Sequence, residues 1–265
     1  MKKVIFTVLL SFLSISGFAS DLVQIISVNE SPMSENAAIS IVFPKTNKTE
    51  TSSDVKVQLR VRGFSIGNRS QVPRTNDLAN SRLGQSIHVI IDNESYFAKA
   101  GPSIAPFDEE GNYYESMYKF KIPFSLDSGE HSIRVFLARS FGESIKSSEG
   151  FASSYFYVNS LDPKIDQDLD APYITYNEPS SYMRFKEQEP ILLDFYISNC
   201  ELSQDGYKVK VIVDNKITRI LTRWTPYYIY GLKKGTHKIK LELLDKNDQR
   251  VEGEFNNNSR KFRIY

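Results

Sequence analysis

The chain has 265 residues, of which 40% are hydrophobic and 25% are charged, and its formal net charge is +1. This near-neutral balance excludes a protein that works through a strongly basic surface, so we expect no binding to nucleic acid. Cys200 is the only cysteine, so no disulfide can form within one chain. Each domain must therefore be held together by the burial of apolar side chains.

The first 19 residues have the three zones of a secretory signal peptide. Lys2 and Lys3 give a basic start, residues 4–15 form an apolar run, and Gly17 and Ala19 match the small-x-small pattern before a cleavage site. The run is shorter than the roughly 20 residues that cross a bilayer. We predict a cleaved signal peptide (1–19), no transmembrane span in the mature chain, and export from a bacterial cytoplasm to the periplasm, the cell surface or the medium.

The mature chain contains an internal repeat. Three pairs of segments align in the same order: Ser86–Asn93 with Lys208–Asn215, Leu126–Leu137 with Leu232–Leu243, and Phe156–Val158 with Phe262–Ile264. In both copies the third segment begins 27 residues after the glycine of the second (129 to 156, and 235 to 262). The order and the equal spacing indicate a duplicated unit.

In each repeated segment, apolar side chains occupy every second position. This period of two residues is typical of a β-strand with one buried face. Turn-forming Asp-Asn and Leu-x-x-Gly sequences bound these segments. Each copy has about 100 residues with frequent turn signals, which is typical of a sandwich domain. We therefore predict an all-β protein with two tandem immunoglobulin-like β-sandwich domains. His131 and His237 occupy the same repeat position, and we expect both to serve the fold.

The linker is predicted at residues 161–172, where prolines and acidic residues gather. This gives a first domain at 21–160 and a second domain at 173–265. The first copy is longer between its repeated segments, and the extra residues form an inserted loop around Ala98–Ser116. A surface loop of this kind is either functional or merely tolerated.

The Asn-Cys-Glu-Leu-Ser sequence at 199–203, the Val-Asp-Asn turn and the Leu-x-x-Gly-x-His motif resemble tandem immunoglobulin-like or fibronectin-type modules of exported bacterial proteins. Those modules are mostly of uncharacterised function. The resemblance covers most of both copies and implies a fold and an exported location, with no reaction attached. Residues 138–152 of the first copy also match a segment of such modules, whereas residues 244–248 of the second copy depart from it.

The densest polar cluster next to a predicted strand contains Arg139, Ser140, Glu143, Ser144 and Lys146. An arginine side chain presents a planar set of donors that suits a carboxylate, and Glu143 is close enough in sequence to supply one. The cluster has two interpretations. It is either an ion pair that fixes a loop at the rim of the sandwich, or a small binding cleft beneath the inserted loop.

Aromatic residues gather in the second copy, where Trp224, Tyr227 and Tyr228 lie close together in sequence. Exposed aromatic rings bind sugar rings or extended peptides. The alternative is that these rings fill the core. An exposed flat row would favour a carbohydrate-binding module, and buried rings would favour packing.

The sequence contains no motif for a catalytic site, a metal site or a cofactor site. His88 alternates with apolar neighbours, so we expect it to face solvent, and we expect Cys200 to act as a buried small apolar residue. The leading hypothesis is an exported, non-enzymatic binding or interaction protein of the bacterial cell envelope, whose partner is a protein or an envelope glycan. The alternatives are a carbohydrate-binding protein that uses exposed aromatic rings and, third, a hydrolase with an unrecognised site.

Overall fold

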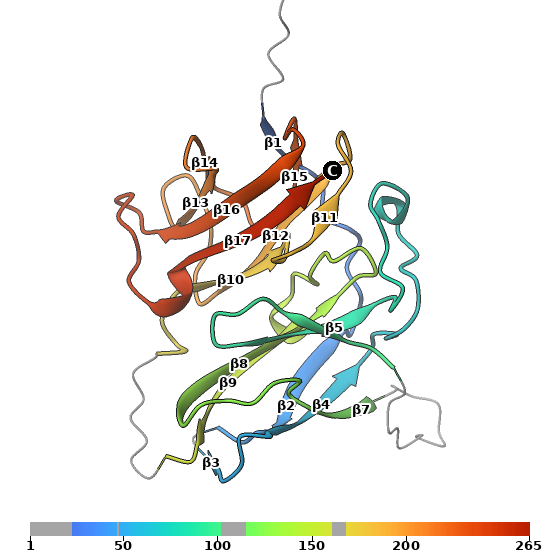
Figure 1. The fold of residues 1–265 in the computed structure, drawn as a ribbon, viewed down its shortest axis with the longest axis vertical. Helices are drawn as coiled ribbons and strands as arrows, with labels where there is room; N and C mark the ends of the chain where they lie inside the picture. Colours follow the sequence, from blue (N-terminus) through green and yellow to red (C-terminus); the bar gives the residue numbers. More distant parts are fainter. Residues whose placement is uncertain (1–22, 47, 102–114, 161–167) are drawn as a thin grey trace, which may run out of the picture.

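The computed structural model describes residues 23–46, 48–101, 115–160 and 168–265. Within these ranges the chain forms two β-sandwiches, and the only helical pieces are short 3-10 turns. Figure 1 shows the sandwich formed by the earlier part of the chain below the one formed by the later part. The all-β, tandem-sandwich prediction is confirmed. The signal peptide, most of the inserted loop and residues 161–167 of the linker lie outside the described residues.

The first sandwich has one sheet of three strands and one of five. The smaller sheet has the order β2-β4-β7, with strands β2 (Ala38–Phe43), β4 (Lys56–Arg62) and β7 (Glu115–Lys121). The larger has the order β3-β9-β8-β5-β6, with strands β3 (Thr49–Glu50), β9 (Phe151–Val158), β8 (Gly129–Ala138), β5 (Ser86–Ile91) and β6 (Phe97–Lys99). Their inner faces enclose one apolar core.

The second sandwich repeats this plan. One sheet has the order β1-β15-β12-β10, with strands β1 (Gln24–Ser27), β15 (Tyr227–Tyr230), β12 (Ile191–Ser198) and β10 (Tyr173–Glu178). The other has the order β11-β17-β16-β13-β14, with strands β11 (Arg184–Phe185), β17 (Asn257–Ile264), β16 (Gly235–Leu244), β13 (Lys208–Val213) and β14 (Ile217–Leu221). The repeated sequence segments correspond to β5 and β13, β8 and β16, and β9 and β17.

The two repeated histidines fasten equivalent turns in the two sandwiches. In the first, His131 Nδ1 lies 2.8 Å from Asp92 Oδ2 and Nε2 lies 2.9 Å from the carbonyl oxygen of Asp127. In the second, His237 makes the same pair of contacts with Asp214 and with the carbonyl oxygen of Lys233, both at 2.7 Å. The structural role expected for these two residues agrees with this geometry.

Strand β5 is buried on both faces, which a strand at the surface of an isolated sandwich would not be. One face lies in the core, and the other is covered by the second sandwich. His88 lies on the covered face and is only 3% exposed, so the expectation that it faces solvent is wrong. Residues of β5 do alternate between two faces, but the face that carries His88 lies against the second sandwich and not against solvent.

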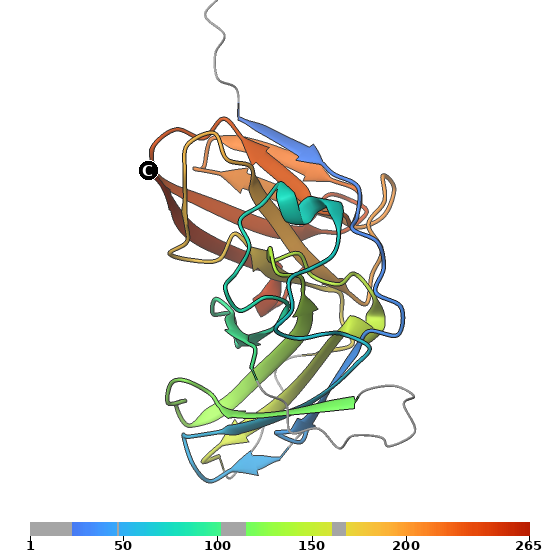
Figure 2. The same ribbon diagram turned by 90° about the vertical axis from the view of Figure 1, so that its right-hand side faces the viewer.

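The first described strand, β1, belongs to the second sandwich. It pairs antiparallel with β15, from Gln24 opposite Tyr230 to Ser27 opposite Tyr227. Both views show β1 beside the strands of the later part of the chain, from which the chain runs down to the first sandwich (Figure 1, Figure 2). The predicted domain boundary at residue 21 therefore needs correction, because residues 24–27 complete a sheet of the other domain.

Replacing Ile25 by aspartate is expected to destabilise the second sandwich by about 2–3 kcal/mol, because Ile25 packs against its core and a carboxylate there would be buried without a partner. Its neighbour Ile26 is 45% exposed, and Ile26→Asp should change stability by about 0.5 kcal/mol or less. Urea unfolding followed by the fluorescence of Trp224 measures both. Equal losses for the two variants would contradict the placement of β1.

Cys200 is half-buried and packs against the core of the second sandwich. Burial raises the pKa of its thiol to about 11, so the sulfur stays protonated at neutral pH. This agrees with the expectation of a small apolar residue. Among the described residues, no helix is long and apolar enough to cross a membrane.

Candidate functional site: the junction of the two sandwiches

The outer face of β5, β8 and β9 packs directly on the outer face of β10 and β12. Aromatic rings form the apolar part of this junction. The ring of Phe151 stacks on Tyr196 with centroids 4.4 Å apart, and Tyr196 meets the edge of Trp224 at 4.7 Å. Phe136, near the C-terminal end of β8, stacks on the same tyrosine at 6.4 Å. Residues from both sandwiches thus form one continuous packed cluster.

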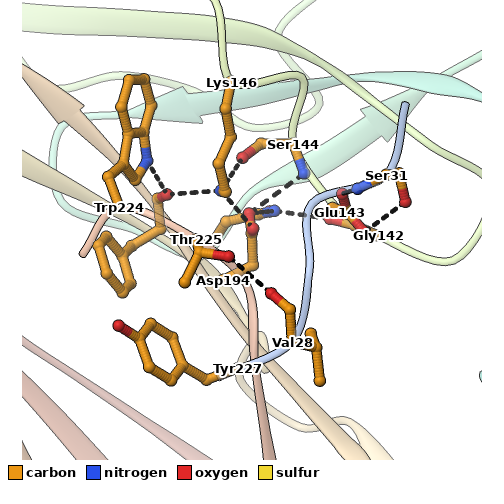
Figure 3. Close-up of polar contacts among 12 residues, drawn as sticks. Val28, Ser31, Gly142, Glu143, Ser144, Lys146, Asp194, Trp224, Thr225 and Tyr227 are labelled. Atoms are coloured by element: carbon orange, nitrogen blue, oxygen red, sulfur yellow. Dashed lines mark hydrogen bonds and ion pairs between the residues drawn. The ribbon is translucent and has the colours of Figure 1, made fainter. Parts of the chain in front are cut away.

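A buried ion pair crosses the junction beside these rings (Figure 3). Lys146 Nζ of the first sandwich lies 2.7 Å from Asp194 Oδ1 of the second, and the two side chains are 4% and 0% exposed. Lys146 also donates to the carbonyl oxygen of Phe195 at 3.2 Å. The other oxygen of Asp194 accepts from the backbone N–H of Ser144 (3.2 Å) and from Asn177 Nδ2 (2.7 Å). Each charge is therefore compensated and hydrogen-bonded, as burial requires.

Glu143 holds the segment that follows β1. Its carboxylate accepts the backbone N–H of Ser31 at 3.1 Å and the hydroxyl of Ser31 at 3.0 Å. It also pairs with Arg74, from the loop between β4 and β5. Thr225 holds the same segment directly after β1, because its hydroxyl donates to the carbonyl oxygen of Val28 at 2.7 Å (Figure 3).

Arg139 and Ser140 serve the loops of the first sandwich. The guanidinium of Arg139 donates to the carbonyl oxygen of Pro32, and burial lowers its pKa. Ser140 donates its hydroxyl to Asn80 at 2.6 Å and its backbone N–H to the hydroxyl of Ser70 at 3.0 Å. The expected sharing of the Glu143 carboxylate with Arg139 is replaced by the pairing with Arg74.

The cavity bordered by Arg139, Glu143 and Lys146 has a volume of only about 10 Å³, which is room for about one water molecule. This favours the fastening interpretation of the cluster over a ligand cleft at this point. These contacts join the two domains through Lys146 and Asp194, and they also fix loops within the first domain through Ser140. Arg139 also borders a shallower hollow of about 540 Å³ on its other side, together with Arg69 and Gln85.

The three aromatic residues singled out in the second copy do not form an exposed flat row. Tyr227 and Tyr228 are 5% and 7% exposed. Trp224 is half-buried and donates its indole N–H to the carbonyl oxygen of Phe195 at 3.0 Å. The alternative of an exposed aromatic platform made of these three rings is therefore wrong, and the packing alternative agrees with their burial. Trp224 does line a hollow of about 450 Å³ at the junction, together with Phe151 and Tyr173.

Sequence reasoning missed the partners on the other side of the junction. Asn177, Glu178 and Asp194 are polar residues inside apolar strands, and all three are 3% exposed or less. Asn177 Oδ1 lies 2.8 Å from Nδ1 of His88, across the junction. Burial lowers the pKa of His88 to about 4, although the bond to Asn177 opposes this, so its ring is neutral at neutral pH. The sequence feature that could have indicated them is a carboxylate or amide side chain inside a strand whose other residues are typical of a buried core.

Within the described ranges, no group of three or more His, Cys, Asp or Glu side chains is arranged to hold a metal ion.

No family model matches the chain, and no curated protein matches it. Solved structures that match the chain include fibronectin(III)-like modules of Clostridium thermocellum CbhA, with 12% identity over 85% of this chain and 93% of that chain and a TM-score of 0.29. Another is SGBP-B of the Bacteroides ovatus mixed-linkage glucan utilization locus, in complex with a heptasaccharide, with 13% identity over 87% and 48% of the two chains and a TM-score of 0.20. A third is CBD12 from CALX1.2, with 9% identity over 85% and 99% and a TM-score of 0.20. At these identities and TM-scores the similarity carries no argument about fold or function.

Proposed function

We propose that the protein is an exported, non-enzymatic binding protein of the bacterial cell envelope. In this proposal it binds an extended segment of a partner protein at the free edge of β7. Export is supported by the signal-peptide pattern of residues 1–19. The junction supports a binding role because it joins the two sandwiches into one rigid body. Binding surfaces on the two sandwiches then keep a fixed position relative to each other.

A difference between the two sandwiches carries the proposal. Strands β7 and β15 hold equivalent places in the two sandwiches. The sheet order β2-β4-β7 of the first sandwich matches the order β10-β12-β15 of the second. The outer edge of β15 is covered by β1, which pairs with it over residues 24–27. Among the described residues, no strand pairs with the outer edge of β7. The pairing of β1 with β15 supports the proposal that an extended segment pairs with β7 in the same way.

The donors along this edge follow from the register. The backbone N–H of Ile122 donates to the carbonyl oxygen of Val55 at 3.0 Å, on the β4 side. Because N–H groups alternate along a strand, those of Lys121, Lys119 and Met117 point to the open side. The side chains of Lys119 and Lys121 are exposed, so a partner strand with acidic residues would fit best.

Replacing Lys119 by proline tests this function. Proline removes one donor from the open edge and leaves the bonds to β4 intact, since a proline is tolerated where the N–H faces outward. We expect the mature protein and Lys119→Ala to capture the same envelope protein. We expect Lys119→Pro to bind that protein with an affinity about tenfold lower or weaker still. The partner is identified after cross-linking, and its Kd is then measured with purified protein. Equal affinity for the proline variant would sink the proposal.

A second candidate function is glycan binding, and the hollow at the junction favours it. Its walls combine the rings of Phe151, Tyr173 and Trp224 with neutral polar groups of Ser153 and Asn199. The hydroxyl of Ser198, on the same wall, is buried and has no hydrogen-bond partner among the described residues. Aromatic faces with neutral donors and acceptors suit a sugar ring.

Titrating a panel of envelope glycans against the fluorescence of Trp224 tests this second candidate. We expect a saturable change that Phe151→Ala reduces about tenfold in affinity, because one aromatic face is lost. Phe124, in the first sandwich, is 42% exposed, and Phe124→Ala is the matched control. A panel without response, or the same loss with both variants, would rule the candidate out.

A further inference from the structure

A separate, partly open cavity of about 350 Å³ lies where the loop after η1 (Pro73–Asn76) meets the second sandwich. Figure 2 shows that this loop leaves the first sandwich and lies beside the strands of the second. Residues 76–79 and Phe141 form one wall of the cavity. Met183, Phe185 and Leu192 form much of the other, and these side chains are apolar. Cavities at the junction of two domains are common places for ligands.

Glu178 also lines this cavity and is only 3% exposed, and its carboxylate is hydrogen-bonded. It accepts the hydroxyl of Tyr96 at 2.5 Å and the backbone N–H of Ser180 at 3.1 Å. No described lysine, arginine or histidine pairs with it, in contrast to Asp194, whose charge is met by Lys146. Glu178 is thus a buried acid in a cavity without a counter-charge.

The mouth of the cavity carries charges of both signs. Asp77 and Glu189 border it and are exposed. The basic side chain at the border is Arg184, whose guanidinium lies 5.2 Å from the ring centre of Tyr265. Glu189 also pairs with Lys186 at 3.5 Å, so Arg184 and Lys186 offset the two exposed acids. Glu178 is thus the one acidic group of the cavity that has no basic side chain near it among the described residues.

We propose that this cavity binds an organic cation, a primary ammonium group at the end of an unbranched apolar stem, as in a lysine side chain. The ammonium would pair with Glu178, and the stem would lie against Phe141, Leu192 and Met183. The ligand class follows from the combination of one buried carboxylate and apolar walls, since each half of such a ligand meets its complement. This site is distinct from the edge of β7 and from the aromatic hollow.

The ionisation of Glu178 supports the assignment. Burial raises the pKa of its carboxyl group to about 8 and the charge of Asp194 adds to this, while the bonds from Tyr96 and Ser180 oppose it. A strongly shifted acid in a cavity is characteristic of binding sites. A bound ammonium would supply the missing positive charge and favour the ionised carboxylate.

Isothermal titration of the mature protein with two matched amides tests the proposal. Nα-acetyl-L-lysine N-methylamide carries the ammonium, and Nα-acetyl-L-norleucine N-methylamide has a neutral apolar chain without it. We expect the lysine amide to bind about 30-fold or more tightly than the norleucine amide, and Glu178→Gln to remove this preference. Glu201, exposed on the second sandwich, provides the control Glu201→Gln, which should bind as the parent does.

Absence of binding by the lysine amide, equal binding of the two amides, or a preference that survives Glu178→Gln would each overturn the proposal. The melting temperature of each variant shows that it is folded before titration. Titration with n-pentylammonium assigns the source of the ligand: equal affinity indicates a free amine, and weaker affinity indicates a lysine within a peptide. Lys119→Pro should bind the lysine amide normally, so a failure here and a failure of the proposed function are separate results.

Discussion

Replacing Lys146 by methionine is expected to lower the free energy of unfolding by about 3–5 kcal/mol, because it leaves the carboxylate of Asp194 buried without its counter-charge. Methionine has a similar shape, so the loss measures the charge rather than a void. Urea unfolding at neutral pH measures the change. The exposed pair of Lys121 and Asp54 supplies the control, since both side chains are about 60% exposed and Lys121→Met should cost about 1 kcal/mol or less.

The double variant Lys146→Met with Asp194→Asn separates charge from packing. Asparagine at 194 still accepts a hydrogen bond from Asn177 or from the N–H of Ser144, and no charge is left without a partner. We expect the double variant to regain most of the stability that Lys146→Met loses. A double variant as unstable as the sum of the two single ones would show that the ion pair is not the cause.

The second large effect concerns Glu178 and pH. Burial raises the pKa of this carboxyl group from 4.5 to about 8, so the folded state favours its protonated form. The stability that this provides is full below pH 4.5 and is lost as the pH rises to about 8. Glu178→Gln imitates the protonated group at every pH. We expect the variant to become more stable than the parent as the pH rises from 4.5 to 8, by about 4 kcal/mol in total.

His88 has the opposite dependence and must be taken into account. Its pKa falls from 6.5 to about 4 in the folded state, so it stabilises the fold above pH 6.5 and this stability is lost as the pH falls towards 4. In the parent the two effects oppose each other between pH 4.5 and 6.5. Comparing Glu178→Gln with the parent at each pH cancels the part due to His88. A difference that does not change between pH 4.5 and 8 would contradict the burial of an uncompensated Glu178.

The duplicated strands could be predicted from sequence because their core faces follow from local alternation. Val209, Val211 and Val213 are fully buried in β13, as that pattern required. The junction could not be predicted in this way. The alternation that buries Ile87 and Val89 on one face of β5 leaves His88 on the other, and sequence does not say whether solvent or a second domain lies there.

The place of β1 was out of reach for a related reason. Four residues with two isoleucines indicate a strand, but its partner, β15, lies about 200 residues later in the chain. Only the structure brings them together. The polar cluster from Arg139 to Lys146 was recognised as important, yet its main partners, Arg74 and Asp194, come from a distant loop and from the other domain.

The two sandwiches are expected to unfold as one body, because a buried network of charges and aromatic rings joins them. Scanning calorimetry of the mature protein tests it most directly. One transition is predicted, with equal calorimetric and van't Hoff enthalpies, and Lys146→Met should move the whole transition to lower temperature. Two separate transitions in the parent protein, neither of them shifted by Lys146→Met, would contradict it.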